Sequence, residues 1–399
     1  MKVLQLSNKV PYPEKDGGVI AISALSRGLI EAGCQVKLLA LNTKKHFVDI
    51  NSIPKEFRES IQLETVEINT TINAFKALAA LISNKSYNIS RFESKEFDRK
   101  LTDILQKEKF DIIQLEGLYL GPYIPIIRKH SNAAIILREH NVEWKIWEWL
   151  AKEERNILKK WYLRKLTKQL KAYEEGTLNT CDGVATITKN DKALLIESGC
   201  KVPIAYIPFG IDISAYAPKE NNSNRLFYIG ALDWLPNLQG LDWFFKNVWN
   251  TIHTVFPAVE FHVAGRNMPE SLRNSNYPGV VFHGEVESAK IFMDNYDIML
   301  VPLFAGSGVR VKIIEGMAMG RPIVTTSVGI EGIECTYGQD ALVADIPEKF
   351  GEAILACLKD ENLKNKLGKN ARKFAETNND IKKITSDLIE FYKEVISKN

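Results

Sequence analysis

Two cations that follow a small-residue loop are the side chains in this sequence best suited to bind an anion. Gly306 and Gly308 bracket Ser307, and Arg310 and Lys312 follow, two residues apart. Glycine lets a backbone approach a ligand closely, and the start of a helix carries about half a positive charge. These residue types therefore predict a site for a phosphate or a diphosphate.

The elements around this loop are predicted to form a βαβ unit. An apolar run at 298–303 has the length of a buried strand, and apolar residues at helical spacing follow the loop. Gly320 is expected to end that helix, and a second apolar run at 323–325 predicts a parallel strand. Ligands of such units bind beyond the carboxyl ends of the strands, where this loop lies.

We expect Arg310 and Lys312 in an extended lead-in to the helix, because residues two apart then point to the same side. Glu315 comes one turn after Lys312 and could accept hydrogen bonds from paired hydroxyls such as those of a ribose. The alternative is a tight turn with two solvated cations and a Glu315–Lys312 ion pair. The two glycines before the cations favour the anion site.

The segment GSGVRVKIIEGMAMGRPIVTT resembles the donor site of the retaining glycosyltransferases of family four. The resemblance implies the GT-B fold of two facing Rossmann-like domains, with Glu315 holding a nucleotide ribose and the two cations holding its diphosphate. Many members carry a second Glu eight positions before the first, where this chain has Ser307. This pattern resembles the family's Gly-Ser-Gly-x-Arg-x-Lys branch and leaves open which group binds the donor sugar hydroxyls.

Length and composition predict a globular protein of two domains. A chain of 399 residues is longer than one core usually supports, and 45% hydrophobic with 25% charged residues is ordinary for a folded protein. The net charge of +3 comes without a dense basic run, so nucleic-acid binding is not expected.

The five cysteines lie far apart without a Cys-x-x-Cys pair, which argues against a disulfide framework and against a zinc site. The apolar run after Met1 is too short for a signal-peptide core, and no run reaches the roughly 18 residues of a membrane span. We expect a cytoplasmic protein, with any membrane contact confined to the surface of the inner face.

The chain opens with a second α/β pattern, in which a loop after the strand at 2–6 carries Gly17 and Gly18. The loop lacks the G-x-G-x-x-G spacing of dinucleotide-binding proteins, so a nicotinamide cofactor is not expected. The glycine pair resembles the family's glycine loop, whose backbone approaches the donor diphosphate. A simple turn before the helix is the alternative.

Two further predicted strands of this half end in polar residues. Glu116 follows the first strand, with Tyr119 nearby, and the resemblance implies that this region lines the acceptor side. His140 and Asn141 follow the second strand within REHNVEW, which resembles a segment of the same branch whose His lies beside donor sugar and acceptor. A strand end is where an α/β protein places a titratable group, although a structural His fits equally well.

A long helical region is predicted over 147–177, with basic and aromatic residues interspersed. Such a helix can form a membrane-surface patch, or it can pack on its domain with a solvated basic face. The acidic residues in the same region favour the packed helix.

A polar stretch, APKENNSNR, follows Gly210 and is typical of a linker. We therefore predict a first domain at 1–208 and a second at 209–379. The resemblance implies that a final helix, over 380–399, packs back onto the first domain.

The second domain contributes two more predicted donor ligands. Arg266 follows a predicted strand, and Val286 lies in a turn that the resemblance implies meets the nucleobase through main-chain groups. Many family members place an Arg and a Lys after the strand at 225–229. This chain has neither there, which shifts the binding of the diphosphate to Arg310 and Lys312.

The sequence as a whole predicts a retaining GT-B glycosyltransferase of polysaccharide biosynthesis. It would move a sugar from a UDP- or GDP-linked donor to a hydroxyl of a glycan or lipid-linked glycan, with no cofactor beyond that co-substrate. No Asp-x-Asp string is present, so we expect metal independence. The alternatives are a nucleotide-sugar epimerase of the same fold and a non-catalytic glycan-binding subunit.

Overall fold

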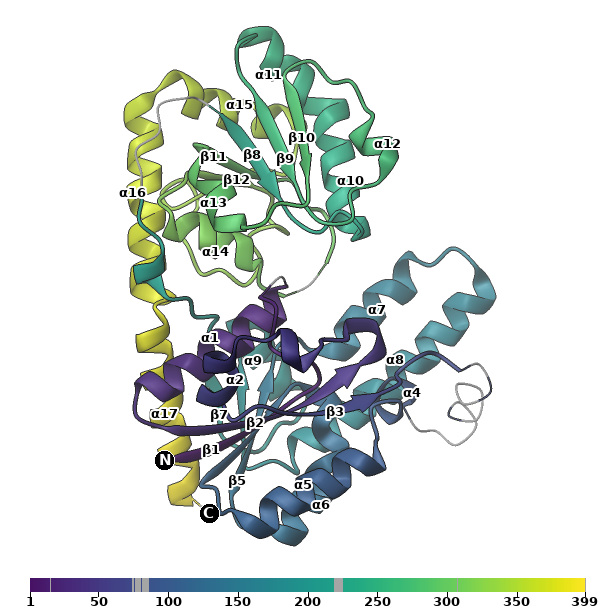
Figure 1. Ribbon diagram of the computed structural model, residues 1–399. Helices are drawn as coiled ribbons and strands as arrows, with labels where there is room; N and C mark the ends of the chain where they lie inside the picture. Colours follow the sequence, from purple (N-terminus) through teal and green to yellow (C-terminus); the bar gives the residue numbers. More distant parts are fainter. Residues whose placement is uncertain are drawn as a thin grey trace. The chain divides into compact units, whose positions relative to one another are not determined.

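The computed structural model describes residues 1–14, 16–73, 75, 80, 86–218, 225–306 and 308–398. The chain divides into two compact units (Figure 1). Unit 1 contains Met1–Gly210 and Ile381–Asn399, and unit 2 contains Ile211–Asp380. The carboxy-terminal helix therefore belongs to unit 1, although the chain reaches it only after completing unit 2.

Unit 1 is built on a seven-stranded parallel sheet with the order β3-β2-β1-β4-β5-β6-β7. Its strands are β1 (Lys2–Ser7), β2 (Gln35–Thr43), β3 (Glu64–Ile68), β4 (Ile112–Glu116), β5 (Ala134–Glu139), β6 (Gly183–Thr186) and β7 (Ile204–Tyr206). The chain fills the sheet outward in one direction from β1 and then in the other from β4. The reversal makes the carboxyl ends of β1 and β4 the place where such a sheet binds ligands.

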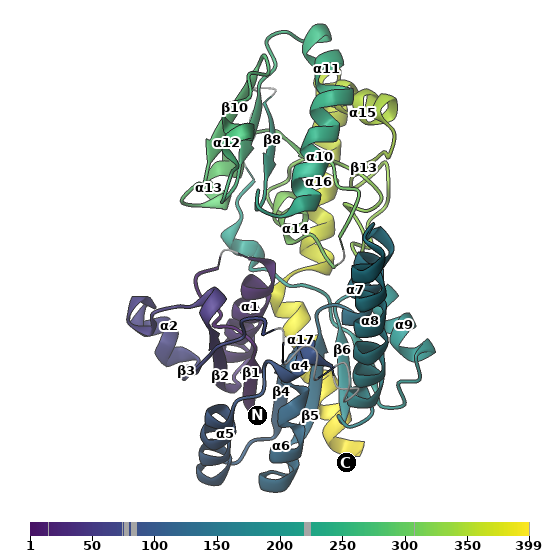
Figure 2. The same ribbon diagram turned by 90° about the vertical axis from the view of Figure 1, so that its right-hand side faces the viewer.

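Helices cover both faces of this sheet (Figures 1 and 2). They are α1 (Gly17–Glu31), α2 (Lys55–Ser60), α4 (Tyr87–Ser90), α5 (Lys95–Lys107), α6 (Ile124–His130), α7 (Glu143–Glu153), α8 (Ile157–Leu178), α9 (Lys189–Glu197) and α17 (Ile381–Lys398), with short 3₁₀ turns at Lys44–His46, Ile50–Ser52 and Leu118–Tyr123.

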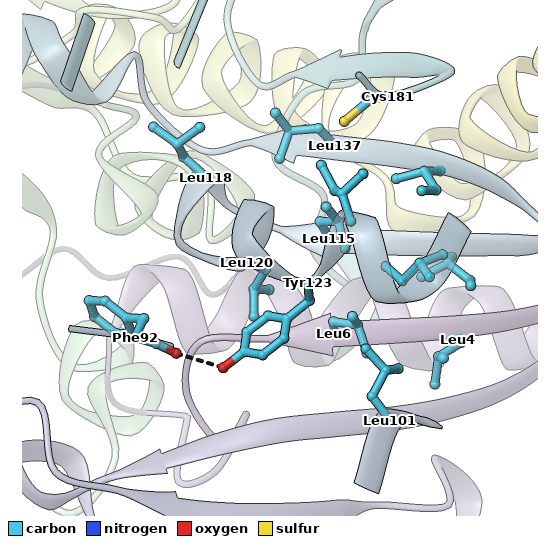
Figure 3. Close-up of a cluster of buried hydrophobic side chains, with 14 of the residues drawn as sticks. Leu4, Leu6, Phe92, Leu101, Leu115, Leu118, Leu120, Tyr123, Leu137 and Cys181 are labelled. Atoms are coloured by element: carbon cyan, nitrogen blue, oxygen red, sulfur yellow. Dashed lines mark hydrogen bonds between the residues drawn. The ribbon is translucent and has the colours of Figure 1, made fainter. Parts of the chain in front are cut away.

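Successive side chains of a strand point to opposite faces of the sheet, so unit 1 has two hydrophobic cores, one on each face. Val3 of β1 packs with apolar residues of α1 and α17, such as Leu29 and Leu388. Leu4 and Leu6 point to the opposite face and pack under α5, α6 and α8 (Figure 3).

The core in Figure 3 includes one buried hydroxyl. The Tyr123 hydroxyl donates a hydrogen bond to the Phe92 carbonyl at 2.6 Å, which satisfies the polar atom among apolar side chains.

Unit 2 has a six-stranded parallel sheet with the order β10-β9-β8-β11-β12-β13. Its strands are β8 (Leu226–Ile229), β9 (Phe261–Ala264), β10 (Val280–Gly284), β11 (Ile298–Val301), β12 (Ile323–Thr325) and β13 (Leu342–Val343). Its helices are α10 (Leu235–Phe244), α11 (Asn250–Val255), α12 (Glu270–Arg273), α13 (Ala289–Asp294), α14 (Val311–Ala318), α15 (Pro347–Lys359) and α16 (Glu361–Asn378), with a π-helical turn at Phe245–Trp249 and a 3₁₀ turn at Ile213–Ala215.

The predicted βαβ unit is confirmed as β11, α14 and β12, whose strands pair in parallel. Gly320 follows the helix with φ +67°, a conformation that favours glycine. The reversal in the strand order of unit 2 lies between β8 and β11. The glycine loop after β11 therefore sits at the predicted ligand-binding edge.

The region predicted to be helical over 147–177 is helical, but it is divided into two helices, α7 and α8, joined by residues 154–156. Asn156 caps α8 by accepting a hydrogen bond from the Lys159 N–H at 3.0 Å, and the Glu154 carboxylate accepts one from the Asn156 N–H at 3.0 Å. These side-chain bonds end one helix and start the next, a signal that periodicity alone does not carry. Within the described residues, no helix is both long and apolar enough to cross a membrane.

Candidate functional site

The glycine loop of unit 2 connects β11 to α14 and passes close to an aromatic ring. Gly306 has φ +110° and Gly308 has φ +80°, a region that only glycine enters easily. A Cβ on Gly306 would lie 2.6 Å from the Trp234 indole, so the close approach also requires glycine. Ser307, a predicted donor ligand, lies outside the described residues.

Arg310 immediately precedes α14 and is buried at the end of this loop. Its guanidinium donates to the Gly308 carbonyl and lies 5.8 Å from the ring centroid of Trp234. Burial lowers the pKa of Arg310, and the carboxylate of Glu331 partly opposes that shift. The guanidinium is thus held against the backbone of the loop that it was predicted to serve.

Lys312 lies in the first turn of α14, so the extended lead-in predicted for both cations is wrong for this residue. The helix begins early because the Arg310 carbonyl accepts a hydrogen bond from the Ile313 N–H at 2.8 Å. The Lys312 ammonium donates to the Tyr228 hydroxyl at 3.1 Å and lies 3.5 Å from Asn237 Oδ1. Both partners lie on the β8 side, so Lys312 reaches across the reversal in the strand order.

Burial, followed by the charge of Arg310, lowers the pKa of Lys312 to about 7. A neutral Lys312 amine in this environment takes up a proton when an anion binds, because the anion stabilises the charged ammonium form. Glycine at position 230 leaves room for the group, since a Cβ there would lie 2.9 Å from the Lys312 Nζ. The arrangement is chemically suited to a diphosphate.

Tyr228 and Asn237 were not singled out by the sequence reasoning. The sequence could have pointed to them only through their positions, since Tyr228 lies near the carboxyl end of β8 and Asn237 in the first turn of α10, the next helix. Those positions indicate a binding site only once the strand order is known.

The other predicted donor ligands of unit 2 also lie at or near the carboxyl ends of strands. Glu315, on α14, accepts a hydrogen bond from the Tyr216 hydroxyl at 2.9 Å through Oε1. Arg266 and Val286 are half-buried and follow β9 and β10. Their contacts with a nucleotide remain predictions.

Gly17 and Gly18 of unit 1 are the first two residues of α1. Asp16 caps this helix by accepting from the Val19 N–H at 3.0 Å, and Lys9 Nζ lies 2.8 Å from the same carboxylate. A Cβ on Gly18 would lie 3.0 Å from that ammonium, so the glycine allows a close approach. The pair therefore lies at a helix start beyond β1, and its role towards a diphosphate remains a prediction.

His140 and Glu116 form a hydrogen-bonded pair at the strand ends of unit 1. His140 Nε2 lies 2.8 Å from Glu116 Oε2. Burial raises the pKa of Glu116, but the hydrogen bond and charge of His140 outweigh burial, so the pKa of this carboxyl is lowered overall. An ionised carboxylate only accepts hydrogen bonds, so Nε2 of His140 carries the proton that this bond needs.

Glu116 is 1% exposed, so it is placed to orient His140 rather than to touch an acceptor. Further polar side chains hold the carboxylate from behind. The Gln114 amide donates to Glu116 Oε1, and the Tyr392 hydroxyl of α17 donates to Gln114 Oε1. Gln5 adds a donor to Glu116 at 3.4 Å. Sequence reasoning missed this network, because Tyr392 is 278 positions from Gln114.

Tyr119 and Asn141, both predicted on the acceptor side, are half-buried. The Tyr119 hydroxyl donates to Glu143 Oε2 at 2.8 Å, and its ring packs against Phe92 with centroids 4.7 Å apart. Tyr119 thus anchors the start of α7, and acceptor binding by either residue remains a prediction.

Three further carboxyl groups, those of Glu139, Glu143 and Glu174, lie near His140 and the start of α7, and sequence reasoning missed them too. Glu174 of α8 accepts from the backbone N–H groups of Glu143 and Trp144, each at 3.2 Å, and so caps α7. Burial raises the pKa of Glu143 to about 7, and burial also raises the pKa of Glu139 and of Glu174. The described residues contain no group of three His, Cys, Asp or Glu arranged to hold a metal ion.

The two Rossmann-like parallel-sheet units, the second with a glycine loop and two cations at its strand reversal, have the architecture of the GT-B glycosyltransferases. Solved structures of this class match the whole chain. Sucrose-phosphate synthase from Thermosynechococcus elongatus matches with a TM-score of 0.73 and 16% identity over 100% of both chains. HepE from Anabaena in complex with UDP matches with a TM-score of 0.68 and 13% identity over 99% of this chain and 100% of that one.

The chain belongs to glycosyltransferase family 4. The family model described as Glycosyltransferase Family 4 matches residues 15–215, and the one described as Glycosyl transferases group 1 matches residues 223–360. An uncharacterised 44.6 kDa protein in the cps region of Klebsiella pneumoniae is 25% identical over 409 residues, covering 97% of this chain and 98% of that protein. The predicted family and fold are confirmed, and the chain is a transferase.

Proposed function

We propose that this enzyme transfers a sugar from a UDP- or GDP-linked donor to a hydroxyl group of a glycan, with retention of the anomeric configuration. The half-buried Lys312, set with the buried Arg310 beside the glycine loop of unit 2, carries the proposal. The Lys312 ammonium lies 3.1 Å from the Tyr228 hydroxyl, and its pKa, lowered to about 7, rises when an anion binds beside it.

Two relatives support the substrate classes. HepE has been solved with UDP and with UDP-glucose, which supports a nucleotide sugar as the donor. The Klebsiella relative lies in a cps region, which supports a role in making a capsule-type polysaccharide. The acceptor would then be a growing glycan or a lipid-linked glycan.

In the proposed reaction, the bond between the anomeric carbon and the diphosphate oxygen breaks as the acceptor oxygen bonds to that carbon. The departing diphosphate takes the acceptor proton, so the step needs no pair of carboxylates for acid–base catalysis. Arg310 and Lys312 stabilise the negative charge that develops on the diphosphate. His140, oriented by Glu116, is proposed to contact the donor sugar.

Thermal denaturation with UDP, GDP and their common sugars tests the donor, because a ligand that binds the native state raises its melting temperature. Product analysis by mass spectrometry with and without a glycan acceptor then tests the reaction. Lys312→Met and Arg310→Ala are each expected to cost about 2 to 4 kcal/mol of transition-state stabilisation in kcat/KM.

Lys246→Ala is the matched control, since it removes an exposed cation of the same unit that is paired with Asp242 at 2.8 Å. It should leave turnover unchanged. Wild-type protein that shows no stabilisation by any nucleoside diphosphate, or full turnover by both site variants, would overturn the proposal. Epimerised donor sugar formed without acceptor would instead identify an epimerase.

A further inference from the structure

The tip of the α7–α8 hairpin exposes large apolar side chains to solvent. Ile157, Leu158 and Trp161 are 82%, 80% and 61% exposed. Their spacing of three and four residues places them on one face of α8. None of residues 157–165 is buried, and every buried residue of α8 lies from Leu166 onward. The first part of the helix is therefore outside the core of unit 1.

The same stretch is strongly basic. Between residues 155 and 168 the sequence has no Asp or Glu and six cations: Arg155, Lys159, Lys160, Arg164, Lys165 and Lys168. Arg164 and Lys165 follow Trp161 by one helical turn, and Lys168 follows by two. The exposed apolar side chains at the start of α8 are thus followed, one and two turns later, by cations on the same side of the helix.

The lengths of the elements show which way the tip extends. The 22 residues of α8 span about 33 Å, whereas the six residues of β5 span about 20 Å. The carboxyl end of α8 leads directly to the amino end of β6, so its surplus length lies at the opposite edge of the sheet. Figures 1 and 2 show the hairpin projecting there, and His140 follows β5 at this same edge.

We propose that this hairpin tip docks the enzyme onto a membrane surface that contains anionic phospholipid. Ile157, Leu158 and Trp161 would enter the headgroup region, while the cations one and two turns away meet the lipid phosphates. Long basic side chains suit this position, because their stems follow apolar groups while their charges stay at the interface.

A bilayer fits the tip better than a protein partner does. A stable protein interface buries about 1,600 Å² in total, and a two-helix tip with three fully projecting apolar side chains offers little flat area for one. The six cations of residues 155–168, of which Lys159 is paired with Glu154 at 2.5 Å, also leave this part of the hairpin with a net positive charge that matches an anionic surface. The inference rests on the proposed function in one respect, since docking would select a lipid-linked acceptor.

The test is co-sedimentation of the full chain with vesicles of phosphatidylcholine alone and with about 30% phosphatidylglycerol, at low and high salt. The wild type should bind the anionic vesicles, and binding should weaken with salt. Ile157→Ser/Leu158→Ser/Trp161→Ser and Arg164→Glu/Lys165→Glu/Lys168→Glu should each lower the vesicle affinity by about tenfold or more.

Ile196→Ser/Ile291→Ser is the matched control, because these residues of α9 and α13 are 50% and 68% exposed elsewhere on the chain. Equal binding by the wild type and the hairpin variants, or equal loss in the control, would overturn the proposal. So would a dimer in light scattering that the serine variant abolishes. Donor hydrolysis, measured without vesicles, should be unchanged in the hairpin variants, which separates this inference from the proposed function.

Discussion

Oε2 of Glu116, the last residue of β4, lies 2.8 Å from Nε2 of His140, which directly follows the neighbouring parallel strand β5. Strand β4 places Glu116 opposite Arg138 of β5, so the imidazole two residues later turns back over the end of the adjacent strand. The carboxylate fixes which ring nitrogen carries the proton. It is therefore a positioning residue for His140.

Glu116→Gln should lower kcat by about tenfold or more while changing the KM for the donor little, because an amide no longer selects one tautomer of His140. The wild-type and variant pH–rate profiles should also differ in shape. Steady-state kinetics across pH provide the measurement, and a profile that coincides with that of the wild type would remove Glu116 from this role.

Tyr392→Phe should lower kcat in the same direction but by less, since it only frees the Gln114 amide that holds Glu116. Loss of one buried hydrogen bond should also reduce the free energy of unfolding by about 1 kcal/mol. Chemical denaturation and kinetics on the same sample check both effects. The neighbouring Phe391→Leu is a packing control that should lower stability and leave the pH–rate profile unchanged.

Lys312 makes nucleotide binding depend on pH. Its pKa of about 7 in the free site rises when a diphosphate binds, so binding takes up a proton above pH 7 and affinity falls as the pH rises. Calorimetry in buffers of different ionisation enthalpy measures that uptake. In Lys312→Arg the side chain keeps its charge at every working pH, so this variant should show no proton uptake by residue 312. Any uptake that remains in the variant comes from titration of the nucleotide and can be subtracted.

Glu315→Gln should weaken nucleoside diphosphate binding by about tenfold, as expected when a charged acceptor of ribose hydroxyls becomes neutral. Tyr216→Phe removes the 2.9 Å bond to Glu315 but leaves the carboxylate, so it should weaken binding less. Isothermal titration with UDP and GDP ranks the two variants. Unchanged affinity in Glu315→Gln would contradict the ribose role.

The buried carboxyls near α7 should make the protein less stable as the pH rises. Burial raises their pKa, to about 7 for Glu143 against an ordinary value of 4.5, so the folded state keeps protons that the unfolded state has lost. Unfolding then releases protons, and the free energy of unfolding falls as the pH rises between these two values.

Glu174→Gln should flatten this dependence, because the amide loses no proton, while its oxygen can still accept from one of the two N–H groups that Glu174 caps at the start of α7. Melting temperatures from about pH 5 to about pH 8 provide the comparison. The same change at the adjacent Glu175 serves as the control and should leave the slope as in the wild type. A slope that is identical in all three proteins would exclude the cluster as its source.

Local patterns were sufficient for much of the fold and for half of the candidate site. Apolar runs, helical periodicity and turn glycines act over a few residues, so the βαβ unit around Gly306 and the family resemblance could be predicted directly. The same locality explains the errors. The helix break at Asn156 and the early start of α14 at Val311 depend on individual hydrogen bonds that periodicity does not register.

Tertiary structure alone decided the contacts that give the site its chemistry. The sequence contains Glu116, His140 and Tyr392, yet nothing local relates them, because strand order and the return of α17 to unit 1 bring them together. In the same way, the pKa of Lys312 reflects its burial against Tyr228 and Arg310. Side-chain identity is written in the sequence, whereas burial and long-range pairing exist only after the chain has packed.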